Sequence, residues 1–197
     1  MQDQFVDLLK AIAKTIDTRG HQTPNHSLRV CRLALITGAE LGIAARRLKR
    51  LELAALLHDI GKLGVELPIL TKPDPLDDRE REEIKFHPLF GVRILEPVRQ
   101  LIDVLPVIRH HHEWYDGRGY PDGLRGKEIP LEPRVLAVAD AFEAMTADRP
   151  YRKARAPQAA IEELHRMSGT QFDPQVVTAF CTAFTRGEVD LSSLEAG

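Results

Sequence analysis

The sequence has few cysteines and no long apolar run. Only Cys31 and Cys181 occur, far apart and each in an apolar, helix-like context. We therefore expect two buried thiols rather than a disulfide framework or a CxxC metal site. Every apolar run is shorter than the roughly 20 residues of a membrane span, and the N-terminus lacks the basic and then apolar layout of a signal peptide. These absences predict a cytoplasmic chain without a membrane segment, and leave an upstream domain open.

An excess of basic charge is also missing. Lys and Arg number 27 against 29 Asp and Glu, so the formal net charge is -2. Non-specific binding of duplex nucleic acid relies on a broad basic field, so we expect no duplex partner. Any anionic ligand must be held by a local site.

Strand patterns, internal repeats and low-complexity tracts are absent as well. Apolar residues recur at helical spacing instead, and 197 residues with 43% hydrophobic content suffice for a sizeable core. We predict an all-α bundle that forms a single domain over 1–197, with its core at about 22–184. The leading helix, within 1–20, is open to packing on the bundle, joining a homodimer or linking to an upstream domain.

Proline and glycine set the expected element boundaries. The predicted helices cover about 5–16, 24–42, 45–60, 88–95, 98–108, 135–145, 157–167 and 174–184, and a further charged helix begins near Asp77 and Asp78. Thr23 and Asn25 are the expected capping residues of the second helix, and Gly61 the expected end of the third. Three prolines predict a long loop over 63–76 that borders the site. Four glycines and two prolines predict a structured loop over 113–130.

Several histidines and aspartates lie in or next to apolar helical segments. His58 and Asp59 are adjacent at the end of a very apolar helix, where a charged carboxylate is costly unless it is paired or metal-bound. Taken alone, such a dipeptide is more often a hydrogen-bonded core pair than a ligand. Imidazoles and carboxylates together suit divalent transition metals, and a shared carboxylate can bridge two of them. The full candidate ligand set is His26, His58, Asp59, His87, His111, His112 and Asp140.

The same residues carry a family resemblance. His58-Asp59 resembles the signature dyad of the HD superfamily of metal-dependent phosphohydrolases. His111-His112-Glu113, followed by Gly119-Tyr120-Pro121, resembles the HHE and GYP motifs of its HD-GYP branch, and the likeness extends from residue 26 to about 180. It implies an HD-domain helical bundle with extra C-terminal helices and a structured GYP loop. It also implies hydrolysis of cyclic di-GMP to pGpG, with further cleavage to GMP left open.

The resemblance implies a binuclear centre. One metal would be held by His26, His58, Asp59 and Asp140, and the other by Asp59, His87, His111 and His112. Asp59 would bridge two divalent transition metals, with iron or manganese favoured and nickel or zinc left open. A water between them would attack the phosphorus in line. Lys62 matches the family's lysine and would contact the scissile phosphate; the alternative is a surface amine near a helix end.

Substrate contacts are also implied. Arg149 and Arg152, beside Tyr151, would each donate paired hydrogen bonds to phosphate oxygens. The alternative is that these arginines solvate a helix terminus or pair with Asp148.

The aromatic residues of the 113–130 loop have two interpretations. Tyr120, with Trp114 and Tyr115, would either stack on guanine or pack the loop. The GYP loop itself, Gly119, Tyr120 and Pro121, is open to a second role in binding diguanylate cyclase domains.

Two positions depart from the family pattern. Gln22 stands where members with a third metal tend to carry Glu. An amide is a poorer hard-cation ligand than a carboxylate, so we predict two metals, with Gln22 at most a weak third-site ligand. Glu143 stands where the family usually has Asp, and the extra methylene would alter a hydrogen bond behind the ligands. The remaining histidines, His21, His110 and His165, are interpreted as non-ligands.

Alternative functions remain open at this point. One is hydrolysis of another cyclic dinucleotide, such as cyclic GMP-AMP, or of a nucleotide monophosphate. The other is a catalytically weak module that binds a cyclic dinucleotide or a signalling protein. Loss of ligand residues would favour the second alternative, and all seven are present.

Overall fold

The described part of the chain consists of helices and connecting loops. The structure is a computed structural model that describes residues 2–19, 23–148 and 153–189. Within these ranges the only β-type pairings are two isolated bridges, Asp116 with Arg125 and Ser168 with Phe172. The α-helices are α1 Gln2–Asp17, α2 His26–Glu40, α3 Ala45–Leu57, α4 Leu67–Leu70, α5 Asp78–Lys85, α6 His87–Leu95, α7 Leu105–His110, α8 Leu131–Thr146, α9 Pro157–Arg166 and α10 Pro174–Thr185. The 3-10 helices are η1 Ile60–Gly64, η2 Arg99–Val104 and η3 Gly126–Glu128.

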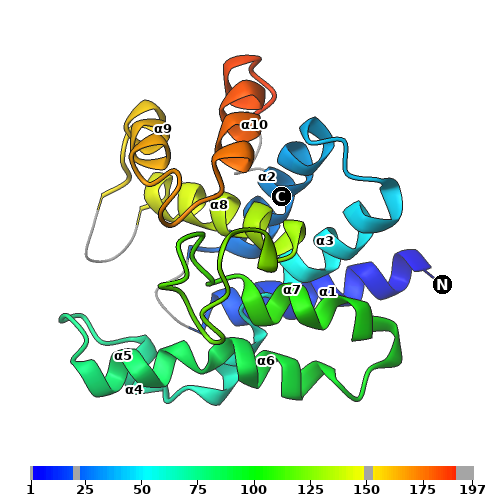
Figure 1. The fold of residues 1–197 in the computed structure, drawn as a ribbon. Helices are drawn as coiled ribbons and strands as arrows, with labels where there is room; N and C mark the ends of the chain where they lie inside the picture. The colour runs from blue at the N-terminus through cyan, green and yellow to red at the C-terminus, as the bar shows by residue number, and fades with distance from the viewer. Residues whose placement is uncertain (1, 20–22, 149–152, 190–197) are drawn as a thin grey trace.

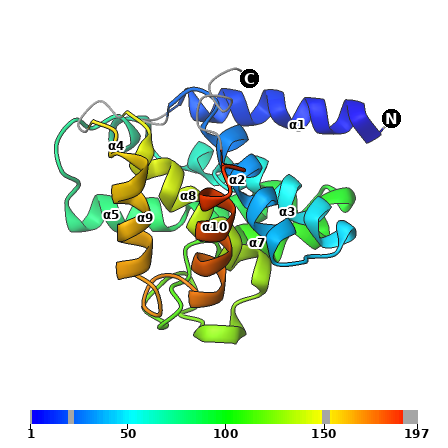
Figure 2. The same ribbon diagram turned by 90° about the horizontal axis from the view of Figure 1, so that it is seen from above.

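The main core lies among α2, α3, α7 and α8. α2 packs against both α3 and α8, and α7 contacts α3 and α8. Their shared apolar faces bury Leu33, Leu51, Ile108 and Phe142 completely or nearly so. α4, α5 and α6 lie at one end of the bundle and α9 and α10 at the other (Figure 1). α1 contacts α2 and α3 and lies along one edge (Figure 2). The predicted all-α bundle is confirmed.

The first turn of α2 is capped by another helix. Its N-cap residue, Asn25, has a left-handed backbone (φ 64°) and makes no side-chain cap. Asp17 of α1, fully buried, instead accepts hydrogen bonds from the backbone N–H of Ser27 at 3.1 Å and from its hydroxyl at 2.7 Å. Asn25 thus occupies the predicted N-cap position, but its side chain does not cap the helix, and the Asp17 carboxylate accepts from a backbone N–H of the first turn instead.

The predicted helix over 45–60 is too long. α3 ends at Leu57, and η1 begins at Ile60. Between them Asp59 has φ -97° and ψ 5°, outside the α-helical region. Gly61 does not end the helix; it lets η1 approach α6, since a Cβ there would lie 1.8 Å from the carbonyl oxygen of His87. The chain thus turns sharply at the histidine and aspartate pair.

Two proline-rich stretches also differ from expectation. The predicted loop over 63–76 contains the short helix α4, because Pro68 lies in its first turn, where a missing N–H costs nothing. The predicted helix over 98–108 is divided into η2 and α7, with Pro106 in the first turn of α7. The helix end expected at the triple histidine is confirmed, since α7 ends at His110, the first of the three.

The two cysteines are free thiols. Cys31 is buried, and burial raises its pKa to about 12. Cys181 is only partly buried, so the expectation of a buried thiol is wrong there: it lines a surface hollow with Thr178 and Thr182 on the outer side of α10.

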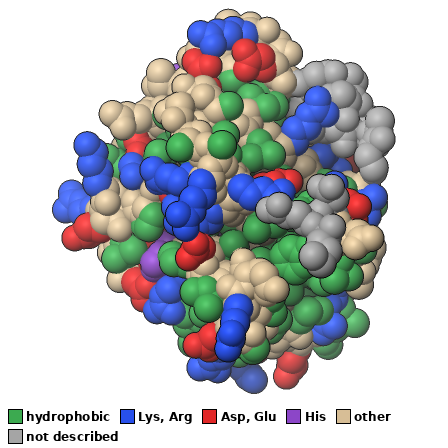
Figure 3. Space-filling view, turned by 90° about the vertical axis from the view of Figure 1, so that its right-hand side faces the viewer, with side chains coloured by type: hydrophobic (Ala, Val, Ile, Leu, Met, Phe, Trp, Pro, Cys, Tyr) green, Lys and Arg blue, Asp and Glu red, His purple; other side chains and the backbone are tan. Residues whose placement is uncertain are grey.

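Surface charges are mixed in sign. Figure 3 shows Lys and Arg side chains interspersed with acidic and hydrophobic ones on one face. At the start of α3 a basic group, Arg46, Arg47, Lys49 and Arg50, surrounds a hollow that also contains Asp103. Every helix of the described ranges is too short or too polar to cross a bilayer.

Candidate metal centre

Two groups of potential metal ligands lie close together inside the bundle. In each group, the nitrogen and oxygen atoms that could bind a metal lie within 4.8 Å of one another. The first group consists of His26, His58 and Asp140, and the second consists of His87, His111 and His112. Both sets were singled out from the sequence, and the fold brings them together from five separate segments of the chain.

Asp59 lies between the two groups. Its Oδ2 is 3.3 Å from His58 Nε2 and 3.8 Å from His26 Nε2, and its Oδ1 is 3.4 Å from His87 Nε2. Each carboxylate oxygen therefore faces a different group. The side chain is 3% exposed, and this position matches that expected of a bridging ligand.

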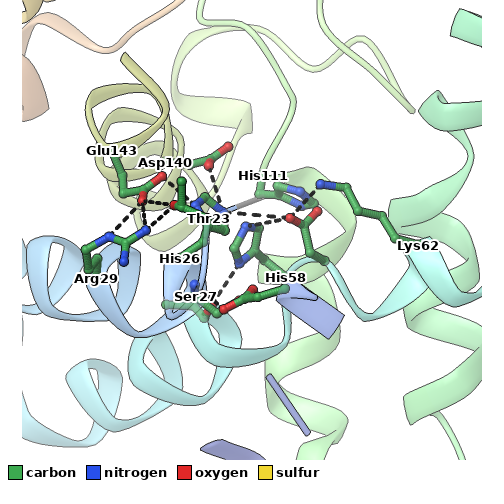
Figure 4. Close-up of polar contacts among 12 residues, drawn as sticks. Thr23, His26, Ser27, Arg29, His58, Lys62, His111, Asp140 and Glu143 are labelled. Carbon is green, nitrogen blue, oxygen red and sulfur yellow. Dashed lines mark hydrogen bonds and ion pairs between the residues drawn. The ribbon is translucent and has the colours of Figure 1, made fainter. Parts of the chain in front are cut away.

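Helix ends position most of these side chains. His26 and His87 are the first residues of α2 and α6, His58 directly follows α3, and His111 directly follows α7. Asp140, in contrast, lies inside α8. Because the chain changes direction at helix ends, rings from different helices can point at one centre. Figure 4 shows His26, His58 and His111 converging there.

The backbone fixes three of the rings. Nδ1 of His58, His87 and His111 lies 2.7, 2.7 and 2.6 Å from the carbonyl oxygen three residues earlier. A carbonyl only accepts, so each Nδ1 carries the hydrogen and donates it. In the neutral ring the lone pair is then on Nε2, the atom that faces the centre. This is the tautomer that binds a metal through Nε2.

The residues present fit a divalent transition metal. Nε2 of His26 and Nε2 of His58 are buried and have no hydrogen-bond partner among the described residues. A buried polar atom without a partner costs about 1–3 kcal/mol, and coordination to a metal removes that cost. Mixed imidazole and carboxylate donors are those that such metals prefer.

The second group consists of rings held neutral. Burial lowers the pKa of His87 to about 4, despite the nearby carboxylate of Asp59. Burial also lowers the pKa of His111 and of His112 well below the ordinary value, and neighbouring rings add to the effect. Neutral imidazole is the form that binds metal, so this group is ready to coordinate at neutral pH.

Asp59 is held as a carboxylate at the middle of the centre. Burial alone would raise the pKa of Asp59, but Lys62 and His58 outweigh it and hold that pKa well below its ordinary value. The Lys62 ammonium lies 2.7 Å from Asp59 Oδ2. Burial opposes the charged His58 ring, yet Asp59 raises the pKa of His58 to about 9.

The 113–130 loop is held by a buried carboxylate. Glu113 accepts hydrogen bonds from the backbone N–H groups of Asp122, Gly123 and Leu124 at 2.7, 3.1 and 3.1 Å. Gly119 allows a close approach, because a Cβ there would lie 2.1 Å from the backbone nitrogen of Trp114. The predicted structured loop is confirmed.

This loop places an aromatic ring beside the second group. Tyr120 stacks on His112 with centroids 5.0 Å apart and planes at 29°, and its backbone N–H donates to the His112 carbonyl at 3.2 Å. Lys85 Nζ lies 6.0 Å from the Tyr120 centroid. Trp114 faces the Arg118 guanidinium at 5.6 Å instead, which supports a packing role for that ring.

Comparison with known proteins decides the family. The family model described as HD domain matches residues 10–176. The chain belongs to the HD domain family. HD domains are metal-dependent phosphohydrolases, and the resemblance seen in the sequence is confirmed.

Relatives and solved structures agree with this assignment. The chain is 37% identical over 196 residues to the cyclic di-GMP phosphodiesterase response regulator RpfG of Xanthomonas campestris, covering 98% of this chain and 51% of the relative. It is 35% identical over 180 residues to the 3'3'-cGAMP-specific phosphodiesterase 3 of Vibrio cholerae, covering 91% and 39%. The structure superposes on that of a Vibrio cholerae cyclic GMP-AMP specific phosphodiesterase with a TM-score of 0.77 at 21% identity, covering 96% of this chain and 50% of that one. The HD domain described here thus spans about half the length of the relatives or less.

Other predicted site residues have different outcomes. Gln22, Arg149, Tyr151 and Arg152, like His21, lie outside the described residues. His110 contacts Asp122 at 2.9 Å, and His165 lines the hollow beside α10. Neither belongs to the two ligand groups of the described residues.

Sequence reasoning missed two residues of this HD domain. Asp17 caps the turn that carries His26, and Arg29 binds the Glu143 carboxylate. Arg29 lies three residues after His26 and so on the same face of α2, which is a weak signal. Its partner, Glu143, lies 114 residues away in the sequence, and no local sequence pattern predicts such a pair.

Proposed function

We propose that this HD domain is a phosphodiesterase that hydrolyses cyclic di-GMP to pGpG, with GMP as a further product if cleavage continues. The observation that carries the proposal is the placement of Asp59, with one oxygen toward each of two three-residue ligand groups. Such an arrangement suits two metals that share one carboxylate.

The ligands divide as the family resemblance implies. His26, His58 and Asp140 would hold one metal, His87, His111 and His112 the other, and Asp59 would belong to both. Iron or manganese is favoured, and nickel or zinc also fits this donor set. When bound, two such metals supply an activated water and stabilise charge on the non-bridging phosphate oxygens.

Lys62 and Tyr120 would act on the substrate. The Lys62 side chain is 22% exposed while its Nζ contacts Asp59, so it can donate to a phosphate oxygen without leaving the centre. Tyr120 covers His112 and would limit water access on that side. Arg149, Tyr151 and Arg152 remain predicted phosphate contacts, and Gln22 remains at most a weak third-site ligand.

A second substrate has independent support. Relatives at similar identity are named for cyclic di-GMP and for 3'3'-cGAMP. Both molecules contain two phosphodiester bonds between purine nucleotides, so the same centre would serve either. Base contacts alone would then decide between the two.

The test combines metal content with product analysis. Protein purified anaerobically is expected to hold about two metals per chain and to convert cyclic di-GMP to a linear product, with 3'3'-cGAMP assayed in parallel. Asp59→Ala is expected to lose most of the metal and at least about 1,000-fold in rate, because both groups lose their common ligand. Retention of wild-type rate by this variant would contradict the proposal.

A non-catalytic module is the other candidate function. Metal content near two with no turnover of either dinucleotide, under several metal reconstitutions, would favour it. Diguanylate cyclase partners at the GYP loop, a homodimer and a cytoplasmic location stay predictions from the sequence.

A further inference from the structure

His26 differs from the other fixed rings in the partner of its Nδ1. His58, His87 and His111 use backbone carbonyls of their own segments. Nδ1 of His26 instead lies 2.5 Å from Oε2 of Glu143, which belongs to a different helix, α8. The orientation of this one ring therefore depends on a side chain.

Two carboxylates of α8 enclose the His26 ring. Asp140 Oδ1 lies 3.4 Å from Nε2 and Glu143 Oε2 lies 2.5 Å from Nδ1. The carboxylates are three residues apart and so share one face of the helix. One helix thus supplies both a candidate metal ligand and the acceptor that sets which ring nitrogen carries the hydrogen.

Glu143 is itself held in place. Its Oε1 accepts from Arg29 Nε at 2.8 Å and from Nη2 at 2.5 Å, and from the Thr23 hydroxyl at 3.3 Å. Arg29 also donates to the Thr23 hydroxyl and, at 2.5 Å, to the Pro24 carbonyl. The Glu143 side chain is 3% exposed and that of Arg29 14%. Figure 4 shows this chain of contacts on the side of His26 away from Lys62.

We propose that Glu143 and Arg29 are positioning residues that set the metal affinity of the group formed by His26, His58 and Asp140, and leave the other group unaffected. The inference rests on the proposed binuclear centre. A partner behind a ligating histidine typically changes metal affinity by about 10- to 100-fold. The second group has backbone acceptors behind His87 and His111, so loss of Glu143 removes nothing there.

A double-variant experiment with Mn²⁺ as the probe separates the two groups. In a His111→Ala background the group with His26 is the intact one, and adding Glu143→Gln is expected to weaken Mn²⁺ binding by about 10- to 100-fold. In an Asp140→Ala background the other group is intact, and adding Glu143→Gln is expected to change affinity less than about twofold. Equilibrium dialysis gives the affinities, and electron paramagnetic resonance shows whether a coupled metal pair forms.

Controls distinguish positioning from loss of folding. Glu132 is a matched control, since like Glu143 it is a buried carboxylate of α8 that binds arginine. Its partners are Arg47 and Arg50. Glu132→Gln is expected to keep wild-type Mn²⁺ affinity in both backgrounds. Arg29→Gln should weaken the same group as Glu143→Gln, and Glu143→Asp should bind Mn²⁺ more tightly than Glu143→Gln.

The outcomes are separable. Equal weakening of both groups by Glu143→Gln, or no weakening of the group with His26, overturns the inference. Failure of the unmodified protein to bind two Mn²⁺ ions overturns the proposed function instead. A Glu132→Gln effect as large as that of Glu143→Gln would assign the change to folding and also overturn the inference.

Discussion

Single residues at this centre are constrained by close approach as well as by chemistry. Gly61 lies between the histidine and aspartate pair and Lys62, and its Cα hydrogen faces the backbone of α6. The fold therefore tolerates no side chain there, although the sequence suggested only a helix stop.

Substitution of Gly61 tests this constraint. Gly61→Ala would place a Cβ 1.8 Å from the His87 carbonyl oxygen, so η1 and α6 must separate, and we expect a loss of about 3 kcal/mol or more in the free energy of unfolding. Urea denaturation measures it. Gly187→Ala is the control: its φ is +74° with nothing within 4 Å, so it should cost only about 1–2 kcal/mol. Equal losses in the two variants would contradict the close-contact account.

At the scale of elements, α8 connects both sides of the bundle through its carboxylates. Asp140 and Glu143 face His26, while Glu132, in the first turn, accepts hydrogen bonds from Arg47 of α3 at 2.9 and 2.7 Å and from Arg50. The ion pairs of Glu132 with Arg47 and Arg50 join α8 to α3 and stabilise the packing of these two helices.

This contact predicts a pH dependence of stability. Burial would raise the pKa of Glu132, but the two arginines outweigh it and lower that pKa from 4.5 to about 2. A lowered folded-state pKa gives stability that is present above pH 4.5 and is lost as the pH falls through about 2. Glu132→Gln should lose about 1–3 kcal/mol at pH 7 and progressively less between pH 4.5 and 2. A difference from the unmodified protein that stays constant over this range would contradict the assignment.

The ends of helices could be predicted from the sequence where residues next to the helix end determine them. The predicted start of a charged helix near Asp77 and Asp78 is confirmed by α5, whose first turn the structure shows to be closed by a capping box of Asp77 and Glu80. The triple histidine lies at a helix end, as predicted. The end of α3 was not predictable, because it depends on how closely η1 approaches α6. The cap of α2 by Asp17 and the support of His26 by Glu143 and Arg29 join distant segments. Such contacts produce no periodic pattern in the sequence, so the sequence alone could not predict them.

For the whole molecule, the proposed binuclear centre implies a link between metal binding and folding. Its ligands come from five segments that pack together only in the folded state, so the unfolded chain cannot offer the same site. We propose that residues 1–197 form one domain whose stability includes this contribution.

Metal removal measures the contribution. Chelation should lower the midpoint of thermal unfolding, and Mn²⁺ should restore it, since free metal at about 100 times its dissociation constant adds about 2.7 kcal/mol per site. In Asp59→Ala, which lacks the shared carboxylate, Mn²⁺ should raise the midpoint of thermal unfolding much less. A midpoint that does not respond to Mn²⁺ in the unmodified protein would contradict the link.

The carbonyl partners of His58, His87 and His111 have a consequence for how this site tolerates mutation. The accepting atoms belong to the backbone of the last turns of α3, α5 and α7, where carbonyls have no later helical N–H to bind. Every amino acid brings a carbonyl, so positions 55, 84 and 108 can change identity without removing the acceptor. Among these four rings, only that of His26 has a side chain as the acceptor for its Nδ1. Drift in sequence can therefore weaken one half of the centre while the other half persists.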